Sequence, residues 1–228
     1  MKNNYYLILL FFTFFLFQNC ASTQVVDAWK AEPSVVELFK QKNVLVIART
    51  ANTQARLAFE NEIADALRER GIKATVSYSK APKIYPNREI TEERMEMIRS
   101  LMASEGFDAV VLTVIKDKSQ TERTSTNGVY FGASYSNYYP GYYGGFYNYY
   151  SYPYAYGSYY NSFGGYIPTS TSTYVDTKYV LETVAYNLNE ATENQLVAVV
   201  TTNIDNPKDS YKTADKYVAL LIKHLETK

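Results

Sequence analysis

The sequence predicts an α/β protein of the mixed (α+β) kind, with a five-stranded mixed sheet and helices on both faces. Three observations predict it. An unbroken apolar run spans 43–48, and such a run is typical of a strand buried on both faces. Two amphipathic segments follow, each ended by a glycine and each followed by another apolar run. Two further apolar runs with a short polar connection precede a last helical pattern, so the order is β-α-β-α-β, then β-β-α.

The N-terminal residues 1–19 are predicted to be a lipoprotein signal peptide. Lys2 supplies a positive start, and Tyr5 to Phe17 is apolar except for Thr13. This run is shorter than the roughly 20 residues of a membrane-spanning helix and fits the apolar region of a secretory signal. Cys20, the only cysteine, follows directly. The arrangement resembles a bacterial lipoprotein signal, in which the cysteine becomes the acylated N-terminus.

Asn19 departs from that pattern, because a small residue usually precedes the cysteine. A plain cleaved signal with an incidental cysteine and a retained anchor therefore remain alternatives. Acyl chains would hold the protein on a membrane, since each buried methylene adds roughly 0.8 kcal/mol. Ala21 and Ser22 are not the acidic residues that commonly retain such lipoproteins at the inner membrane. The resemblance thus implies a location in the bacterial cell envelope, as a periplasm-facing outer-membrane lipoprotein.

The rest of the chain divides into a tether, one domain and an insert. Residues 20–42 are expected to be a lipid-anchored tether. Within it, Val25, Val26 and Trp29 form either a short first strand before Pro33 or a tether whose tryptophan docks on the domain. A single α/β domain is expected over 43–123 and 172–228. A Tyr/Gly-rich, low-complexity insert, 124–171, interrupts it.

The first half of the domain contains two predicted helices. The first covers about 53–70, is capped by Thr50 or Asn52 and ends at Gly71. The second begins after Thr91 and ends at Gly106. Their apolar stripes comprise Ala55, Phe59, Ile63, Ala66 and Leu67 in the first, and Met95, Ile98, Leu101 and Met102 in the second. Strands are expected at 43–48, 72–78 and 107–115. Right-handed crossovers then predict the strand order second, first, third, with the two helices on opposite faces.

The second half contains a predicted hairpin and a closing helix. Strands are expected at 174–188 and 195–202, and Asn206 with Pro207 begins the helix. The apolar stripe of this helix is predicted to be Tyr211, Ala214, Val218, Leu221 and Leu225.

These segments together resemble a known family. The residues that carry the resemblance are Val44-Leu-Val-Ile, the helix ending in Arg-Gly71-Ile, and Gly106-Phe-Asp-Ala-Val-Val-Leu112, followed by two strands and a helix. They are similar to the small α/β domain of the TolB N-terminal region, of the curli-secretion lipoprotein CsgG and of the penicillin-binding-protein activator LpoB. They resemble more closely the uncharacterised bacterial envelope lipoproteins with a Tyr/Gly-rich loop between the third and fourth strands. This resemblance implies binding, scaffolding or assembly work in the envelope and supplies no ligand residue.

Several kinds of chemistry are not predicted. Lys plus Arg and Asp plus Glu number 23 each, so no basic surface for nucleic acid is expected. One histidine and one cysteine do not make a metal site or an intrachain disulfide. No glycine follows the first strand, so no phosphate loop and no cofactor is expected. His224 has no identifiable catalytic partner, and Gly132 to Ser136 lacks the final glycine of a nucleophile elbow. An enzyme is therefore not expected.

Two sets of charged residues in the domain are interpreted as structural. Arg56 and Glu60 are expected to be an i,i+4 pair on the helix surface. Glu182 lies within an apolar strand and is expected to face Arg56 or Arg49 across the sheet, or solvent; a small polar site there is the alternative.

The insert is the unusual feature, because Thr124 to Val175 contains no charged residue. Tyr150, Tyr152, Tyr154 and Tyr156 alternate, so in an extended chain they would point to one face. One interpretation is a solvated loop that a short turn could replace without unfolding the domain. The other is a row of rings that binds an envelope protein or cell-wall glycan, or that self-associates. The expected function is therefore a membrane-anchored structural, scaffolding or protein-interaction role, and the alternative is a glycan-binding or adhesive module.

Overall fold

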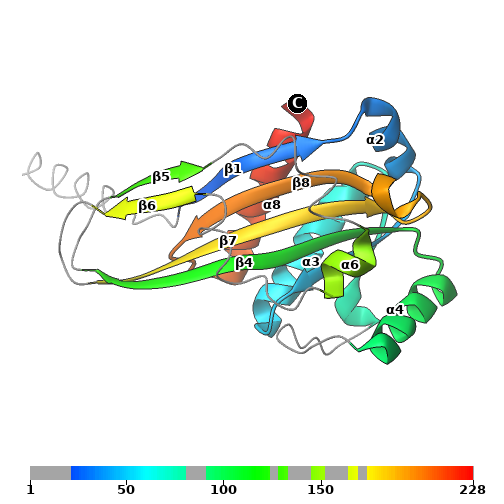
Figure 1. Ribbon diagram of the computed structural model, residues 1–228, viewed down its shortest axis with the longest axis horizontal. Coiled ribbons are helices and arrows are strands. Elements are labelled where there is room, and N and C mark those ends of the chain that lie inside the picture. Colours follow the sequence, from blue (N-terminus) through cyan, green and yellow to red (C-terminus); the bar gives the residue numbers. More distant parts are fainter. Residues whose placement is uncertain are drawn as a thin grey trace, which may run out of the picture.

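The computed structural model describes residues 22–80, 91–123, 128–132, 145–151, 164–168 and 174–227. They form a mixed α/β fold around a six-stranded sheet in the order β1-β8-β7-β4-β2-β3 (Figure 1). Its strands are β1 (Thr23–Lys30), β2 (Asn43–Arg49), β3 (Lys73–Val76), β4 (Ala109–Arg123), β7 (Tyr174–Asn187) and β8 (Leu196–Asp205). The helices are α2 (Pro33–Lys40), α3 (Thr53–Glu69), α4 (Glu92–Ser104), α6 (Phe146–Ser151) and α8 (Ser210–Thr227). The predicted fold class is confirmed.

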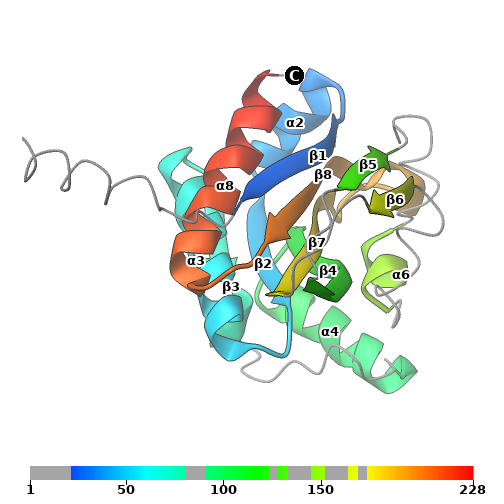
Figure 2. The same cartoon turned by 90° about the vertical axis from the view of Figure 1, so that its left-hand side faces the viewer.

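The parallel half of the sheet follows the prediction. β2 pairs in parallel with β3 on one side and with β4 on the other. The Oδ1 atom of Asn52 accepts a hydrogen bond from the backbone N–H of Ala55 at 3.1 Å, which caps α3. Gly71 and Gly106 have φ angles of +76° and +66°, the left-handed conformation that ends each helix at little cost in glycine. α3 and α4 cover opposite faces (Figure 2).

The sheet has six strands rather than the five expected, because β1 is added at its edge. β1 pairs antiparallel with β8, and Trp29 lies opposite Val199. Of the two alternatives for Val25, Val26 and Trp29, the strand is the one found. α2 follows and buries Phe39, so the segment 22–41 packs against the rest of the fold.

The two strands that flank the insert are long. β4 and β7 pair antiparallel over their whole length, and β7 pairs with β8 only as far as Lys178 opposite Asp205. Residues 174–177 continue beyond that point, paired with 120–123. We call these eight residues the arm. β5 (Gly128–Gly132) and β6 (Gly164–Pro168) form a separate two-stranded ribbon at the same end (Figure 1).

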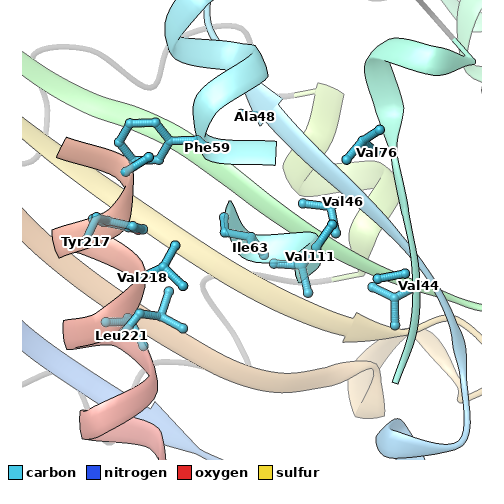
Figure 3. Close-up of a cluster of buried hydrophobic side chains, with 14 of the residues drawn as sticks. Val44, Val46, Ala48, Phe59, Ile63, Val76, Val111, Tyr217, Val218 and Leu221 are labelled. Atoms are coloured by element: carbon cyan, nitrogen blue, oxygen red, sulfur yellow. The ribbon is translucent and has the colours of Figure 1, made fainter. Parts of the chain in front are cut away.

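The first face of the sheet carries a core shared by α3 and α8 (Figure 3). Phe59 and Tyr217 meet there with ring centroids 5.2 Å apart. The predicted stripe of α8 is buried at Ala214, Val218 and Leu221, but Tyr211 is 53% exposed. Tyr217, which the stripe omitted, is fully buried, and its hydroxyl lies 2.6 Å from that of Thr183. In the described parts of the chain, no helix combines the length and apolarity needed to cross a membrane.

Candidate functional site

A cavity of about 310 Å³ lies at the carboxyl end of β2, between the first turns of α3 and α8. In open α/β sheets, ligands bind outside the carboxyl ends of the strands, so its position makes it the candidate binding site. Its apolar wall includes Phe59, Leu181 and Ile204, and its polar rim includes Asn52 and Lys208.

The helix ends beside the cavity are capped by the chain itself. Asn52 caps α3, and the Oδ1 atom of Asp209 accepts a hydrogen bond from the N–H of Lys212 at 2.9 Å. The Thr213 hydroxyl donates to the carbonyl of Asp209 at 2.6 Å. The first two of these bonds use first-turn N–H groups that would otherwise be open to an anion. The cavity therefore suits a small ligand with apolar surface better than a phosphate group.

The side chains that line the cavity are apolar, hydroxyl, amide and charged groups. Its described lining includes neither histidine nor cysteine, and the described residues contain no group of three or more His, Cys, Asp or Glu side chains placed to hold a metal. His224 lies on α8, where its Nδ1 atom is 2.9 Å from the carbonyl oxygen of Leu220. Gly132 ends β5, and the rest of the elbow-like stretch lies outside the described residues.

Helix α6 shows that part of the Tyr-rich insert belongs to the folded domain. Phe146 is fully buried, and its ring centroid lies 6.1 Å from that of Tyr186 on β7. Its N–H donates to the Gln195 Oε1 atom at 3.1 Å. A Cβ on Gly145 would lie 2.5 Å from the Thr192 Cγ2 atom, so a larger residue here would require the Thr192 side chain to move. The interpretation of the whole insert as a solvated loop is therefore wrong for 145–151.

Tyr150 is the one predicted binding tyrosine among the described residues. The Nη1 atom of Arg49 donates to the Tyr150 carbonyl at 2.8 Å, and the guanidinium lies 5.5 Å from the ring centroid. Burial raises the pKa of the Tyr150 hydroxyl, and the nearby Arg49 charge opposes this increase. Tyr150 packs with Phe146 and so contributes to the domain. Tyr152, Tyr154 and Tyr156, like Cys20, lie outside the described residues.

Sequence reasoning missed Phe146, which the structure places at the centre of this contact. A signal was present, because Phe146 and Tyr150 have the i,i+4 spacing of neighbours on one helical face. The surrounding tyrosines and glycines obscured it.

Arg56 and Glu60 do not form the surface pair that was expected. Both side chains are buried, and the Arg56 Nε atom lies 2.9 Å from Glu60 Oε1. The Glu60 carboxylate also accepts from the Ala48 N–H at 3.1 Å, the Ser77 hydroxyl at 2.7 Å and the Tyr78 N–H at 2.8 Å. Three of these four donors bond to Oε1, the Tyr78 N–H bonds to Oε2, and the side chain is fully buried. The carboxylate joins α3 to β2 and to the residues that follow β3, and its burial separates it from any ligand in solution.

Glu182 is also buried, and it forms an ion pair with Lys116 at 3.4 Å. Lys116 lies at the irregularity between Ile115 and Asp117, where β4 has one residue more than β7. The predicted pairing of Glu182 with Arg56 is wrong, because Arg56 lies on α3, which covers the opposite face of the sheet. Arg49 does share the face of Glu182, since both residues lie opposite Val114 on its neighbouring strands.

A second hollow, a groove of about 490 Å³, runs between α3 and α8. Glu62, Asp65, Glu69 and Asp215 lie along it. Partial burial raises the pKa of Glu62, and the three neighbouring carboxylates raise it further. The groove is an electrostatic cost that the fold carries at neutral pH.

Comparisons with known proteins give no family. No family model and no curated protein matches the chain. Among solved structures, the chain is similar to a single-substitution variant of the PelC dodecamer from Paraburkholderia phytofirmans, in space group C2, at 11% identity and a TM-score of 0.38, covering 89% of this chain and 96% of that one. It is similar also to the PelC dodecamer from the same organism in space group P6, at 11% identity and a TM-score of 0.36. That similarity covers 89% of this chain and 95% of the PelC chain.

Proposed function

We propose that the chain is a bacterial envelope lipoprotein held on the outer membrane by an acylated Cys20, with an α/β domain that acts as a scaffolding or protein-interaction module. The observation that carries this proposal is the position of Cys20. It directly follows the signal-like apolar run, and only Ala21 separates it from Ser22, the first described residue of the fold. An acylated Cys20 would therefore hold the domain beside the membrane.

A non-catalytic role is supported by the environment of the buried charges. The buried Glu60 carboxylate accepts hydrogen bonds from four protein donors, and the buried Glu182 forms an ion pair with Lys116. Such pairs hold elements together, whereas a catalytic carboxylate must reach a substrate. The cavity at the carboxyl end of β2 supplies the domain with a place to bind a partner side chain or a small ligand.

The lipoprotein proposal is tested on the mature protein isolated from membranes. The mass of its N-terminal peptide should correspond to Cys20 carrying acyl chains. Cys20→Ser should move the protein from the membrane fraction to the soluble fraction. Asn19→Ala, which restores a small residue before the cysteine, should leave acylation intact. An unacylated N-terminus at another residue would contradict the proposal.

The interaction role is tested by crosslinking the acylated protein in intact membranes and isolating it with its bound proteins. Substitution of cavity residues should then separate partners. Lys208→Glu changes the exposed rim of the cavity, and Lys223→Glu is the matched exposed control on the far part of α8. If Lys208→Glu loses a crosslinked partner and the control variant keeps it, the result supports the cavity as the site that contacts the partner. Equal retention with both variants argues against it.

A glycan-binding role is the second candidate, and the docking of α6 favours it. Because Arg49 holds the carbonyl and ring of Tyr150, the tyrosine row begins from a fixed point on the domain. Binding of purified cell-wall glycan should be measured for the parent chain and for a variant with serine at 152, 154 and 156. Saturable binding that this variant loses supports the role. If neither protein binds glycan, or if both bind it equally, the tyrosine row is excluded as the glycan-binding surface.

A further inference from the structure

The N-terminal end of the fold is fixed next to the proposed anchor. The Ser22 hydroxyl donates to the Asp205 Oδ2 atom at 2.6 Å, and the Asp205 N–H donates to the Ser22 carbonyl at 2.9 Å. Thr23 then pairs with Ile204 as the first residue of β1. The two steps from Cys20 to Ser22 span at most about 7 Å. The described fold therefore begins, at Ser22, at this end of the molecule.

The arm extends from this same end. Its residues 174–177 lie beyond the point where Asp205 pairs with Lys178, and at about 3.3 Å per residue they reach roughly 13 Å further. This overhang is about twice the longest reach from Ser22 to Cys20. Figure 1 shows the arm, the start of β1 and the β5–β6 ribbon together at one end, and α2 and α4 at the other.

This end of the molecule combines apolar and charged residues, as a surface in the headgroup layer of a bilayer would. Val175, on the arm, is 63% exposed, and the arm also contains Glu122, Arg123 and Asp176. The ribbon strands Gly-Val-Tyr-Phe-Gly and Gly-Gly-Tyr-Ile-Pro contain no charged residue. Tyrosine is enriched at membrane–water interfaces, where its ring and hydroxyl meet apolar and polar surroundings. Lys118, nearer the sheet, lies 5.7 Å above the Tyr179 ring and places a positive charge behind the arm.

We propose that the arm and the β5–β6 ribbon form the membrane-facing surface of the protein and rest in the headgroup layer of the lipid bilayer. The proposal depends on the acylation of Cys20 proposed above. The link from Ser22 to Cys20 is shorter than the arm beside it. An acylated Cys20 would therefore bring the arm into contact with the bilayer. The contact sets the orientation of the domain, whereas the acyl chains supply the affinity.

The test uses single introduced cysteines, because acylation occupies the only native cysteine. Val175→Cys is compared with Leu38→Cys on α2 and Met97→Cys on α4, which replace side chains that are 48% and 69% exposed at the opposite end. Each acylated full-length variant carries an environment-sensitive fluorophore and is placed in phosphatidylethanolamine–phosphatidylglycerol vesicles. All three positions are exposed, so folding should be preserved.

The fluorophore at position 175 should lose most of its emission when the vesicles contain a quencher-bearing lipid, and should be protected from aqueous iodide. The fluorophores at 38 and 97 should show the reverse. Vesicle-bound protein with position 175 as open to iodide as the two controls would overturn the proposal. Failure of the anchor is distinguishable, because the parent chain would then leave the vesicles and accept the fluorophore at Cys20.

Discussion

The guanidinium of Arg49 holds the backbone carbonyl of Tyr150 at 2.8 Å, across a separation of 101 residues in the chain. The same guanidinium lies 5.5 Å from the centre of the Tyr150 ring. One contact therefore connects the end of a central parallel strand to a helix within the uncharged insert. It makes part of the insert a structural element of the domain.

The insert should prove necessary for full stability. Phe146→Ala removes a fully buried ring from beside Tyr186 and should lower the free energy of unfolding by about 3–5 kcal/mol. Met97→Ala, on the exposed surface of α4, should change it by no more than about 0.5 kcal/mol. Urea unfolding of both variants measures the difference. Replacing Asn127 to Thr171 by a short Gly-Ser turn should also destabilise the domain, and an unchanged melting temperature would show that α6 is not packed as described.

The buried pair of Arg56 and Glu60 should behave unlike a surface pair. Glu60→Ala leaves the Arg56 charge and several donors buried without the carboxylate, and should cost about 3–5 kcal/mol. Glu37→Ala, which breaks the exposed pair with Lys40, should cost less than about 1 kcal/mol. Chemical denaturation of the two variants provides the comparison. Similar small losses would mean that water reaches the pair.

Helix α8 should tolerate a charge on one face only. Leu221 is 8% exposed in the core between α8 and the sheet, so Leu221→Asp buries an unpaired carboxylate and should cost at least about 3 kcal/mol. Lys212→Asp, in the exposed first turn, should cost little, because helix N-termini favour negative charge. Thermal unfolding followed by circular dichroism tests this prediction. Equal destabilisation by the two changes would contradict the packing of α8.

The groove between α3 and α8 should make stability depend on pH through Glu62. Its pKa in the folded protein is raised above its ordinary value of 4.5, chiefly by desolvation and then by Asp215, Asp65 and Glu69. The folded state thus favours protonated Glu62, a contribution that is present below pH 4.5 and is lost as the pH rises through the folded pKa. Glu62→Gln should therefore raise the melting temperature at pH 7, and the gain should shrink towards pH 4.

Glu93→Gln makes the same substitution in the first turn of α4, away from these carboxylates, where the helix N-terminus favours the negative charge. It should not reproduce the pH-dependent gain. A gain from Glu62→Gln of the same size at both pH values would indicate that packing, rather than charge, limits stability at this position.

The sequence by itself determined the elements whose signals are local. The unbroken apolar run of β2, the cap at Asn52 and the glycine stops at Gly71 and Gly106 depend on residues close together in the chain. The strand order around β2 also followed, because right-handed crossovers leave few arrangements open. The hairpin of β7 and β8 followed from two apolar runs with a short connection.

Only the tertiary structure decided which of those elements meet and what becomes buried between them. The i,i+4 spacing of Arg56 and Glu60 is the same on an exposed surface and beneath Ser77 and Tyr78, so spacing could not reveal their burial. The pairing of β1 with β8 joins residues nearly the length of the chain apart. Phe146 becomes a core residue because it packs against Tyr186 and bonds to Gln195. Burial and long-range pairing are properties of the assembled sheet, since the free energy that selects them comes from surfaces that exist only once distant segments have come together.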